Sequence, residues 1–281
     1  MIIVADSGST CTDWVIIEKK QVLDTFKTKG FNPYFTKSEG ITSELKSRYP
    51  KHIDLNAIET IYFYGSGCSS KEMNLIIHNG LSPFFKNSKI EIEHDLLAAA
   101  RALFQNESGI AVILGTGSNT CYYDGKSIVK NITSLGFILG DEGGGDYMGK
   151  LFIQSYLNKE LPDEIMHAFF SEYNLTSNQI LHAVYKEEYP NRFLSTFSKF
   201  ILNHAENEAI SKIINTTFSD LFSKHICKYE NYKSLNIRCT GSISHFFSKQ
   251  LNSVAKSYSA QIDLIEKEPI KGLTQYHINN T

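Results

Sequence analysis

The fold of this chain is decided by Ile2-Ile3-Val4-Ala5-Asp6-Ser7-Gly8-Ser9-Thr10 and by its counterpart Ile110-Ala111-Val112-Ile113-Leu114-Gly115-Thr116-Gly117-Ser118-Asn119. Each is a short apolar run that enters a turn of small and hydroxyl residues, and each is followed at once by a second apolar run. The pattern predicts two β-hairpins whose backbone N–H groups and hydroxyls converge at the turn, where an anion can bind. Two such hairpins in one chain indicate a phosphate chain held from two sides.

The elements around these turns are predicted in the same order twice. In the first half we predict strands 2–5, 13–18, 21–28, 60–64 and 89–93 and helices 38–48, 71–79 and 96–104. In the second half we predict strands 110–114, 121–123, 127–133, 235–239 and 261–265, helix 243–257, a short helix from Pro269, and a long helical stretch at about 147–230 that is broken at Pro162 and Pro190.

This order predicts an α/β fold of two domains, 1–105 and 106–267, each a mixed five-stranded sheet with flanking helices. The helical stretch at about 147–230 is an insertion into the second domain. The last helix lies within 268–281, and the sequence leaves open whether it packs back on the first domain.

Composition excludes several classes of function. The chain has 281 residues, 42% of them hydrophobic and 21% charged, which is typical of a soluble globular protein large enough for two domains. A net charge of −2 gives no electrostatic basis for binding nucleic acid or an anionic membrane. We find no signal peptide and no apolar run of the ~18 residues that a membrane span needs.

The five cysteines are scattered, without the spacing of a zinc site, an iron–sulfur cluster or a disulfide framework. A reducing cytoplasm is therefore the expected compartment. The partners we expect are small molecules, and the sequence leaves the number of subunits open, with a homodimer as one option.

Three aspartates that follow predicted strands are the candidates for chemistry. Asp6 is either an Asx-turn residue or a carboxylate that holds hydrated Mg²⁺ against phosphates. Asp95 is either the N-cap of helix 96–104 or a general base that accepts the proton of an attacking hydroxyl. Asp141 lies in the glycine-dense segment 140–146, which is either a connector or an anchored binding loop.

Two other patterns are set aside. Segment 144–150 matches the G-x-x-x-x-G-K part of a Walker A loop, but it lacks the following Ser or Thr and has Asp146 where phosphates would lie. His94 and Asp95 are adjacent, and neighbouring residues of a strand point to opposite faces, so they are not expected to act as a pair.

Taken together, the motifs resemble those of the N-acetylglucosamine kinase branch of the BadF-type ATPase family, within the superfamily of sugar kinases, actin and heat-shock chaperones. The motifs that carry the resemblance occur in the family's order over nearly the whole chain, at 5–14, 95–103, 113–119, 135–143 and 240–243. The resemblance implies two ribonuclease-H-like domains of the actin-type ATPase fold.

The resemblance also implies the nucleotide contacts. Asp6 would hold Mg²⁺, and the phosphates of ATP would lie between the two turns. The residues implied at the phosphates are Ser7, Gly8, Ser9, Thr10, Thr116, Gly117 and Ser118. Thr240, Gly241 and Ser242 are similar to the family's adenosine motif, where small residues let the nucleotide approach the backbone.

For the sugar, the resemblance implies Asp95 as the base that takes the proton of the primary hydroxyl. Asn32, Gly117, Asn119 and Asp141 are similar to the family's other sugar contacts. A polar sugar site needs such fixed donors and acceptors, because each unpaired buried hydroxyl costs about 1–3 kcal/mol. Without the family, Asn32-Pro33 would be read as an ordinary turn.

Three positions depart from the family's pattern. Cys11 stands where a basic residue is common, so a cation near the γ-phosphate is absent and turnover is expected to be modest unless Mg²⁺ or another residue compensates. Phe137 stands in place of Trp and Gly144 in place of Ser, and both changes bear on the shape of the sugar pocket.

The sequence therefore predicts an ATP- and Mg²⁺-dependent amino-sugar kinase, with N-acetylglucosamine as substrate and its 6-hydroxyl as acceptor. The alternatives are a kinase of glucosamine or N-acetylmuramic acid, an activator ATPase of the BadF type, and a sugar sensor that binds without phosphorylating. The activator reading is disfavoured by the scattered cysteines, and Cys11 is the one hint of a sensor.

Overall fold

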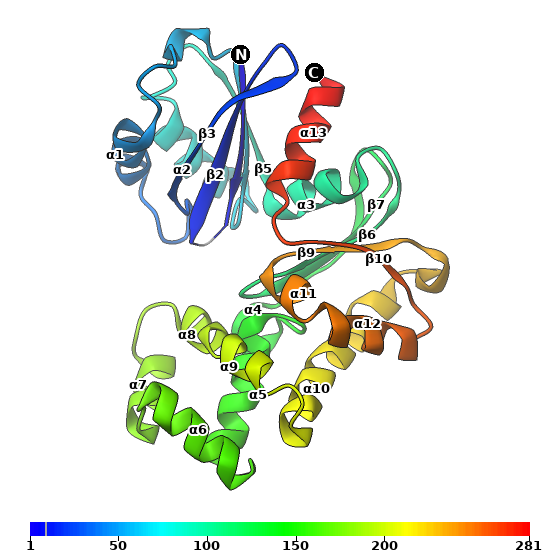
Figure 1. Cartoon of the computed structure of the whole chain (residues 1–281). Coiled ribbons are helices and arrows are strands. Elements are labelled where there is room, and N and C mark those ends of the chain that lie inside the picture. The colour runs from blue at the N-terminus through cyan, green and yellow to red at the C-terminus, as the bar shows by residue number, and fades with distance from the viewer. Residues whose placement is uncertain (9) are drawn as a thin grey trace. The chain divides into compact units, whose positions relative to one another are not determined.

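The structure is a computed structural model that describes residues 1–8 and 10–281, and its contacts divide the chain into two units (Figure 1). Unit 1 comprises Met1–Glu107, Gly125–Ser127 and Pro269–Thr281, and unit 2 comprises Ser108–Asp124 and Ile128–Glu268. Each unit contains one five-stranded mixed sheet with flanking helices. The predicted α/β fold is thereby confirmed.

The sheet of unit 1 has the strand order β3-β2-β1-β4-β5. Its strands are β1 (Ile2–Ser7), β2 (Cys11–Glu18), β3 (Gln21–Lys29), β4 (Thr60–Gly65) and β5 (Lys89–His94). The first three strands form an antiparallel meander, while β4 and β5 run parallel to β1. The carboxyl ends of the three parallel strands therefore meet at one edge of the sheet.

Helices cover both faces of this sheet (Figure 1). They are α1 (Ser38–Arg48), the 3-10 turn η1 (Leu55–Ala57), α2 (Lys71–Leu81), α3 (Asp95–Phe104) and α13 (Ile270–Asn280). Alternate strand residues such as Ile3, Trp14 and Phe63 form a core with Ile41 of α1 and Ile77 of α2. The period-two alternation of the strands thus separates the α1 and α2 face from the face under α3 and α13.

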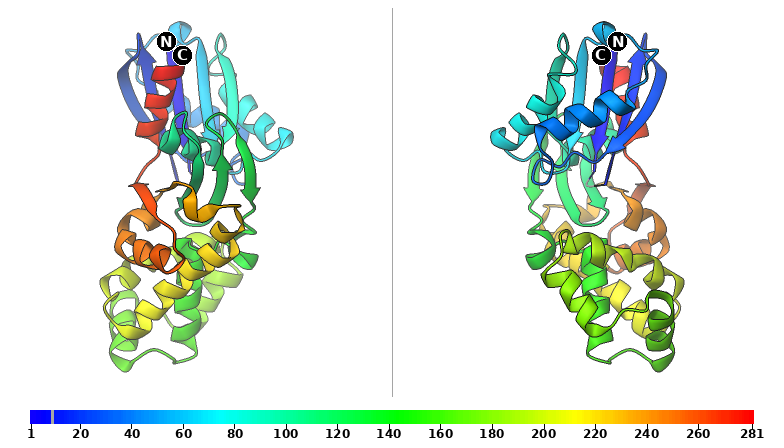
Figure 2. Two further views of the ribbon diagram at one scale, coloured as in Figure 1. Left: turned by 90° about the vertical axis from the view of Figure 1, so that its right-hand side faces the viewer. Right: turned by 90° about the vertical axis from the view of Figure 1, so that its left-hand side faces the viewer.

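The C-terminal helix α13 packs against α3 within unit 1, which the sequence left open. The approach is close, because a Cβ on Gly272 would lie 2.4 Å from the backbone oxygen of Ala102. Gln105 Nε2 donates to the Gly272 carbonyl at 2.9 Å. The buried His277 lies 2.9 Å from the Tyr64 hydroxyl, and burial lowers the pKa of this histidine to about 3. Both chain ends lie on the same side of unit 1 (Figure 2).

The sheet of unit 2 has the strand order β10-β9-β6-β7-β8. Its strands are β6 (Gly109–Leu114), β7 (Ser118–Tyr123), β8 (Ile128–Ile132), β9 (Ile237–Thr240) and β10 (Ile262–Glu266). As in unit 1, the first three strands form an antiparallel meander and the last two run parallel to its first strand. Leu114, Thr240 and Glu266 therefore end at one edge.

The helices of unit 2 form most of its core. They are α4 (Gly136–Leu139), α5 (Gly145–Leu157), α6 (Asp163–Tyr173), α7 (Ser177–Tyr185), α8 (Pro190–Thr196), α9 (Ser198–Asn203), α10 (Glu208–Lys224), α11 (Ser242–Phe246) and α12 (Ser248–Ser257), with 3-10 turns η2 (Ile226–Lys228) and η3 (Tyr232–Ser234). Phe152, Phe169, Phe197 and Phe200 pack edge to face in their centre. No helix in the described residues is long and apolar enough to span a membrane.

Two details differ from the sequence-based expectation. Segment 243–257, predicted as one helix, is the pair α11 and α12, because the backbone leaves helical geometry at Phe247, whose buried ring packs 6.2 Å from that of Phe218. The short helix α4 was not predicted. The predicted breaks in the helical insertion are confirmed, with Pro162 as N-cap of α6 and Pro190 in the first turn of α8.

Candidate active site

In unit 1, three chemically relevant residues lie at the shared carboxyl edge of β1, β4 and β5. The register pairs Ser7 with Gly65 and Gly65 with His94. The backbone N–H of Ser66 donates to the Ser7 carbonyl at 2.8 Å. Asp6, Ser66 and Asp95 therefore follow one another along this edge, as parallel strands require.

Asp95 is the first residue of α3, and the N-cap is His94. The expectation that Asp95 itself caps the helix is therefore wrong. The imidazole takes this role because His94 Nδ1 accepts a hydrogen bond from the Leu97 N–H at 3.2 Å, which leaves the carboxylate of Asp95 available for other partners.

The carboxyl group of Asp95 accepts hydrogen bonds from the Leu96 N–H and from the Ser66 hydroxyl. Burial raises the pKa of Asp95 to about 6, although these hydrogen bonds act in the opposite direction. A carboxylate with this pKa is still mostly ionised at pH 7 and is a stronger base than an ordinary aspartate. Ser66 was not singled out from the sequence, although Gly65-Ser66-Gly67 after a predicted strand is a signal that could have found it.

Asn32 lies beside the same loop. Its Oδ1 accepts from the Tyr34 N–H at 3.0 Å, so the ordinary turn considered for this residue does form. A Cβ on Gly67, whose φ is +84°, would lie only 2.6 Å from Asn32 Oδ1. The mostly buried Asn32 is thus held next to the residue that follows Ser66, which brings two of the predicted sugar contacts, Asn32 and Asp95, to one end of unit 1.

The first glycine turn is stabilised by hydrogen bonds of the Ser7 side chain. Its buried hydroxyl lies 2.7 Å from that of Thr12 and accepts from the Phe31 N–H at 2.9 Å. The turn is closed by the Gly8 N–H donating to the Cys11 carbonyl at 3.0 Å. The Ser7 hydroxyl therefore stabilises the turn through these hydrogen bonds. The Thr10 carbonyl accepts a hydrogen bond from the Gly30 N–H. Ser9, the remaining predicted phosphate contact, lies outside the described residues.

The predicted metal ligand Asp6 is the sixth residue of the chain and pairs in register with Asp13 across the hairpin. Asp13 forms an ion pair with Lys27 at 2.7 Å. Cys11 is exposed as a residue, but partial burial of its thiol, together with the negative charge of Asp13, raises the pKa of that thiol. Among residues 1–8 and 10–281, no three His, Cys, Asp or Glu side chains form a metal-ligand group. One carboxylate suits Mg²⁺, which is usually completed by water and substrate phosphates.

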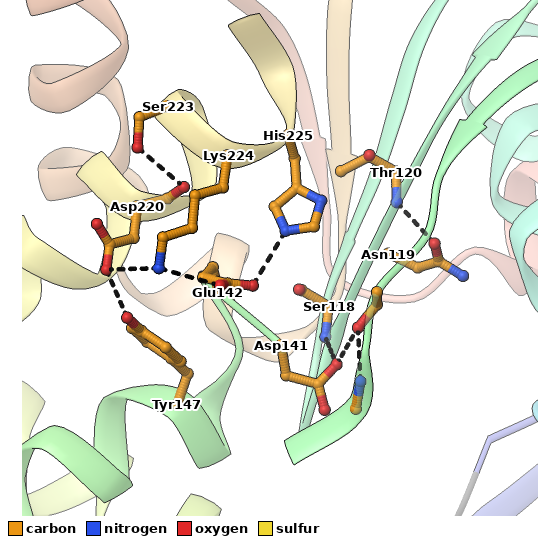
Figure 3. A network of polar contacts seen from close by, with 12 residues as sticks. Ser118, Asn119, Thr120, Asp141, Glu142, Tyr147, Asp220, Ser223, Lys224 and His225 are labelled. Atoms are coloured by element: carbon orange, nitrogen blue, oxygen red, sulfur yellow. Dashed lines mark hydrogen bonds and ion pairs between the residues drawn. The ribbon is translucent and has the colours of Figure 1, made fainter. Parts of the chain in front are cut away.

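In unit 2, the second glycine turn and the acidic loop are joined by backbone hydrogen bonds. The Gly145 N–H donates to the Gly115 carbonyl at 2.9 Å, and the Asp146 N–H donates to the Thr116 carbonyl at 2.8 Å. The Asp141 carboxylate accepts from the Ser118 N–H at 3.3 Å and from the Ser134 hydroxyl (Figure 3). The loop at 140–146 is therefore anchored to the second glycine turn and is not a free connector.

Glycines at two positions allow this close approach. A Cβ on Gly117 would lie 2.8 Å from Asp141 Oδ2, and a Cβ on Gly144 would lie 2.7 Å from the carbonyl carbon of Gly117. Asp141 itself has a φ of +62°, which Asp tolerates better than most residues. The departure from the family at Gly144 thus has a physical reason in this chain, because a serine there would force turn and loop apart.

Asn119 and Ser118 are placed beside this loop. Asn119 Oδ1 accepts from the Thr120 N–H at 3.0 Å and from Asn131 Nδ2 at 3.0 Å, which fixes its carboxamide on β7. The Ser118 hydroxyl is buried, and no described residue forms a hydrogen bond with it. Three predicted sugar contacts, Gly117, Asn119 and Asp141, are thus brought together at one edge of unit 2.

Glu142 points away from Asp141 and anchors the loop to α10 (Figure 3). Its carboxylate accepts from Lys224 Nζ at 3.1 Å and from His225 Nε2 at 3.1 Å. Lys224 also contacts Asp220, which accepts a hydrogen bond from the Tyr147 hydroxyl. Burial alone would raise the pKa of Glu142, but the hydrogen bonds from His225 and Lys224 outweigh it and lower the pKa below its usual value.

Replacing Glu142 with Gln is expected to destabilise unit 2 by about 1–3 kcal/mol at pH 7, because buried hydrogen bonds to a charged group are lost. A carboxyl whose pKa is lowered on folding stabilises the protein above its unfolded pKa and loses this effect as pH falls through the folded value. Urea unfolding of wild type and variant should therefore converge below about pH 4. Glu206→Gln, in an exposed 3.9 Å pair with Lys249, is the control and should change stability little. Equal destabilisation at pH 7 and pH 3 would contradict the expectation.

The predicted adenosine motif lies directly on the second turn. Gly241 has a φ of +115°, and a Cβ there would lie 2.2 Å from the Leu114 carbonyl oxygen. Its N–H donates to the Glu266 carbonyl at 3.1 Å. The Thr240 hydroxyl is buried, and it has no hydrogen-bond partner in the described chain. Thr240, Gly241 and the neighbouring Ser242 thus present backbone without side-chain obstruction at the edge where β6 ends.

Segment 144–150, which matches part of a Walker A loop, has contacts unlike those of a phosphate-binding loop. Gly144 is the N-cap of α5, and the side chain of Asp146 is buried at the start of that helix. Lys150 Nζ, which a Walker lysine would extend toward phosphates, donates to the Phe137 carbonyl at 3.0 Å. This lysine is thus used to hold the short helix α4.

Comparison with known proteins places these features in a family. No protein-family model matches the sequence, and no curated protein matches it. Among solved structures, a protein of Porphyromonas gingivalis described as a "Putative N-acetylglucosamine Kinase" is 38% identical over 100% of this chain and 99% of its own, with a TM-score of 0.94.

Two more distant structures share the fold alone. A "Putative N-acetylglucosamine Kinase" of Chromobacterium violaceum is 13% identical, with 98% of each chain covered and a TM-score of 0.75. A ROK family glucokinase of Streptomyces griseus, solved with glucose and AMPPNP, is 12% identical over 98% of this chain and 97% of its own, with a TM-score of 0.55. Because the similarity to the P. gingivalis protein spans both chains almost completely, this chain belongs to the N-acetylglucosamine kinase branch of the sugar kinases with the actin-type ATPase fold.

Proposed function

We propose that the protein is an ATP-dependent kinase of an amino sugar, with N-acetylglucosamine as substrate and its 6-hydroxyl as acceptor. The observation that carries the proposal is the partly buried Asp95 carboxylate, held by Ser66 at the carboxyl edge of a parallel sheet with a pKa of about 6. The full-length similarity to the P. gingivalis protein supports the same class of substrate.

In the proposed reaction, Asp95 accepts the proton of the sugar hydroxyl as its oxygen attacks the γ-phosphorus of ATP. A new P–O bond forms to the sugar oxygen, the bond between the γ-phosphorus and the bridging oxygen breaks, and ADP leaves. Asn32, Gly117, Asn119 and Asp141 are the residues that we propose to fix the sugar through its other hydroxyls and its amide. The raised pKa of Asp95 suits this proton transfer at neutral pH.

The nucleotide would be bound by backbone groups of the two turns and by the Thr240–Ser242 segment. Gly8, Thr10, Thr116, Gly117 and Ser118 would face the phosphates, and Gly241 would let the adenosine approach the sheet edge where β6 ends. Asp6 would hold Mg²⁺, which neutralises charge on the phosphates when bound. The AMPPNP in the S. griseus glucokinase supports ATP as the nucleotide for this fold.

Other acceptor sugars and other classes of protein are distinguished by the ADP-release assay described below. Glucosamine and N-acetylmuramic acid differ from the proposed substrate at single groups, which a few pocket residues distinguish. An activator ATPase that shares an iron–sulfur cluster between subunits would need a cluster-like arrangement of accessible cysteines. Cys68, Cys121 and Cys239 are buried, and the other two, Cys11 and Cys227, are far apart in the sequence. The free state of all five cysteines supports a reducing, cytoplasmic location.

Release of ADP is expected to depend on the sugar when purified protein is mixed with ATP, Mg²⁺ and a panel of amino sugars. N-acetylglucosamine should give the highest kcat/KM, with glucosamine and N-acetylmuramic acid as comparisons and glucose as the sugar without nitrogen. Phosphorus NMR of the product should show a 6-phosphate ester.

Absence of sugar-dependent ADP across the panel would overturn the kinase proposal. Sugar binding by calorimetry without turnover would then indicate a sensor. A brown, iron-containing protein after anaerobic expression would indicate the activator class.

A further inference from the structure

We propose that Asp146 is a positioning residue that shares a proton with Asp141 and thereby holds the Asp141 carboxyl group ready for the sugar. This rests on the proposed function, in which Asp141 binds the sugar. Asp146 itself does not touch the substrate in this proposal, because its side chain is buried at the start of α5.

The geometry leaves the two carboxyl groups against each other. Asp146 is 1% exposed, and its Oδ1 accepts from the Tyr147 N–H at 2.6 Å. Its Oδ2 is fully buried, and no residue among 1–8 and 10–281 donates a hydrogen bond to it. The carboxyl of Asp141 lies within hydrogen-bonding reach of the Asp146 carboxyl. Two carboxyl groups can form a hydrogen bond only if one of them carries a proton, so the pair is satisfied when Asp146 is protonated.

The surrounding charges favour this protonated state. Burial raises the pKa of Asp146 to about 8, and the neighbouring Asp141 acts in the same direction. Lys150, one turn along α5, acts in the opposite direction, but its ammonium donates to the Phe137 carbonyl. At the C-terminal end of α10, Lys224 forms an ion pair with Glu142, which also contacts His225 Nε2, and Asp220 contacts both Lys224 and the Tyr147 hydroxyl.

The position of Asp146 explains what the proton would do. Its backbone N–H donates to the Thr116 carbonyl in the second glycine turn, and its carboxyl reaches Asp141 in the loop at 140–146. With the proton present, Asp141 has donors from Ser118, Ser134 and Asp146, which together fix its rotamer. With the proton lost, two adjacent carboxylates repel each other, and a further negative charge lies beside the proposed phosphate site.

The first test measures KM for the sugar and kcat between pH 6 and 9.5. For wild type, KM should rise by roughly tenfold per pH unit above about pH 8, with kcat changed less than twofold. Asp146→Asn keeps a donor to Asp141 that cannot titrate, so its KM should be near that of wild type at pH 7 and flat to pH 9.5. Asp146→Ala, which lacks the donor, should raise KM by about tenfold at every pH. Asp163→Asn, an exposed acidic residue on α6, is the matched control.

An Asn variant that keeps the alkaline rise of KM would overturn the proposal. So would an Ala variant in which kcat and KM change together without any pH dependence, because that is the signature of a merely structural role.

A second test needs no activity and separates this inference from the proposed function. The pKa of Asp146 is raised from 3.8 on folding, so the folded state binds more protons between about pH 4 and 8, and the stability that this group contributes falls as pH rises through that window. The Tm of Asp146→Asn minus that of wild type should therefore increase from pH 5 to pH 8 and level off above it. A constant difference would overturn the shared proton, whereas a rising difference in a protein that phosphorylates no sugar would sustain it and reject only the kinase.

Discussion

Replacing Asp95 with Asn is expected to lower kcat by a factor of 10²–10⁴, the range that positioned general bases contribute. Asparagine has nearly the same shape and can still contact the Ser66 hydroxyl, but it cannot accept the proton of the sugar hydroxyl. KM for the sugar should change little, because the hydrogen bonds of the ground state are largely kept. Steady-state release of ADP from wild type and variant, at saturating sugar and ATP, measures this effect.

The pH dependence gives this prediction a second signature. With the pKa of Asp95 at about 6, wild-type kcat should decline as pH falls below about 6, and the residual activity of the Asn variant should lack that decline. A pKa raised from 3.8 on folding means that the stability contributed by Asp95 is lost as pH rises through about 6, so the Asn variant should have the higher Tm at pH 7. Glu93→Gln, on the exposed side of β5, is the control. Unchanged turnover in the Asn variant would remove Asp95 from the role of base.

Replacing Gly241 with Ala is expected to destabilise the protein by about 3 kcal/mol or more and to weaken ATP binding. The φ of +115° belongs to a region that is essentially restricted to glycine, and strain of this kind costs about 1–3 kcal/mol. The added Cβ would also lie 2.2 Å from the Leu114 carbonyl oxygen, so β9 or the second turn must shift. Thermal unfolding should show a fall in Tm of roughly 6–12 °C, and KM for ATP should rise.

Gly115→Ala is the matched control for this change. Gly115 lies in the same turn, its φ is not in the left-handed region, and, its two chain neighbours aside, a Cβ there would meet no atom of residues 1–8 and 10–281 within 4 Å. Its Tm should therefore stay within about 2 °C of wild type. If both alanine variants lose the same stability, the close contact of Gly241 with Leu114 is not the cause, and the argument for an unobstructed backbone at the nucleotide site fails.

Sequence patterns could predict the sheets because their signals are local. The short apolar run Ile2-Ile3-Val4-Ala5 and the glycine turns mark strand and turn without reference to the rest of the chain. The N-cap of α3 was assigned one residue too late, because an aspartate before an apolar helix is the stronger statistical signal. The imidazole of His94 makes that bond instead, which depends on its rotamer.

The candidate site could be predicted only where a motif carried it. The turns and Asp95, Asp141 and Gly241 were found by spacing and by resemblance. Ser66 and Glu142 were not, since their roles arise from partners far along the chain, and Asp146 was not, because its contact with Asp141 depends on how the loop at 140–146 folds. Ser66 meets Asp95 across two strand ends, and Glu142 meets Lys224 and His225 over 82 and 83 residues.

By itself, the sequence determined that this protein has two α/β units with a helical insertion in the second, each with a glycine turn after its first strand, and a kinase-like set of aspartates. The two units, the insertion and the glycine turns follow from periodicity and turn chemistry, which act between near neighbours, whereas the kinase-like roles of the aspartates are what the family resemblance implies. Only the tertiary structure decided that α13 packs on α3, that Asp146 lies against Asp141, and that Gly144 must be small. Those outcomes depend on which surfaces come within about 3 Å of each other after folding. They also depend on which charged groups lose their water on burial, and the sequence does not reveal this.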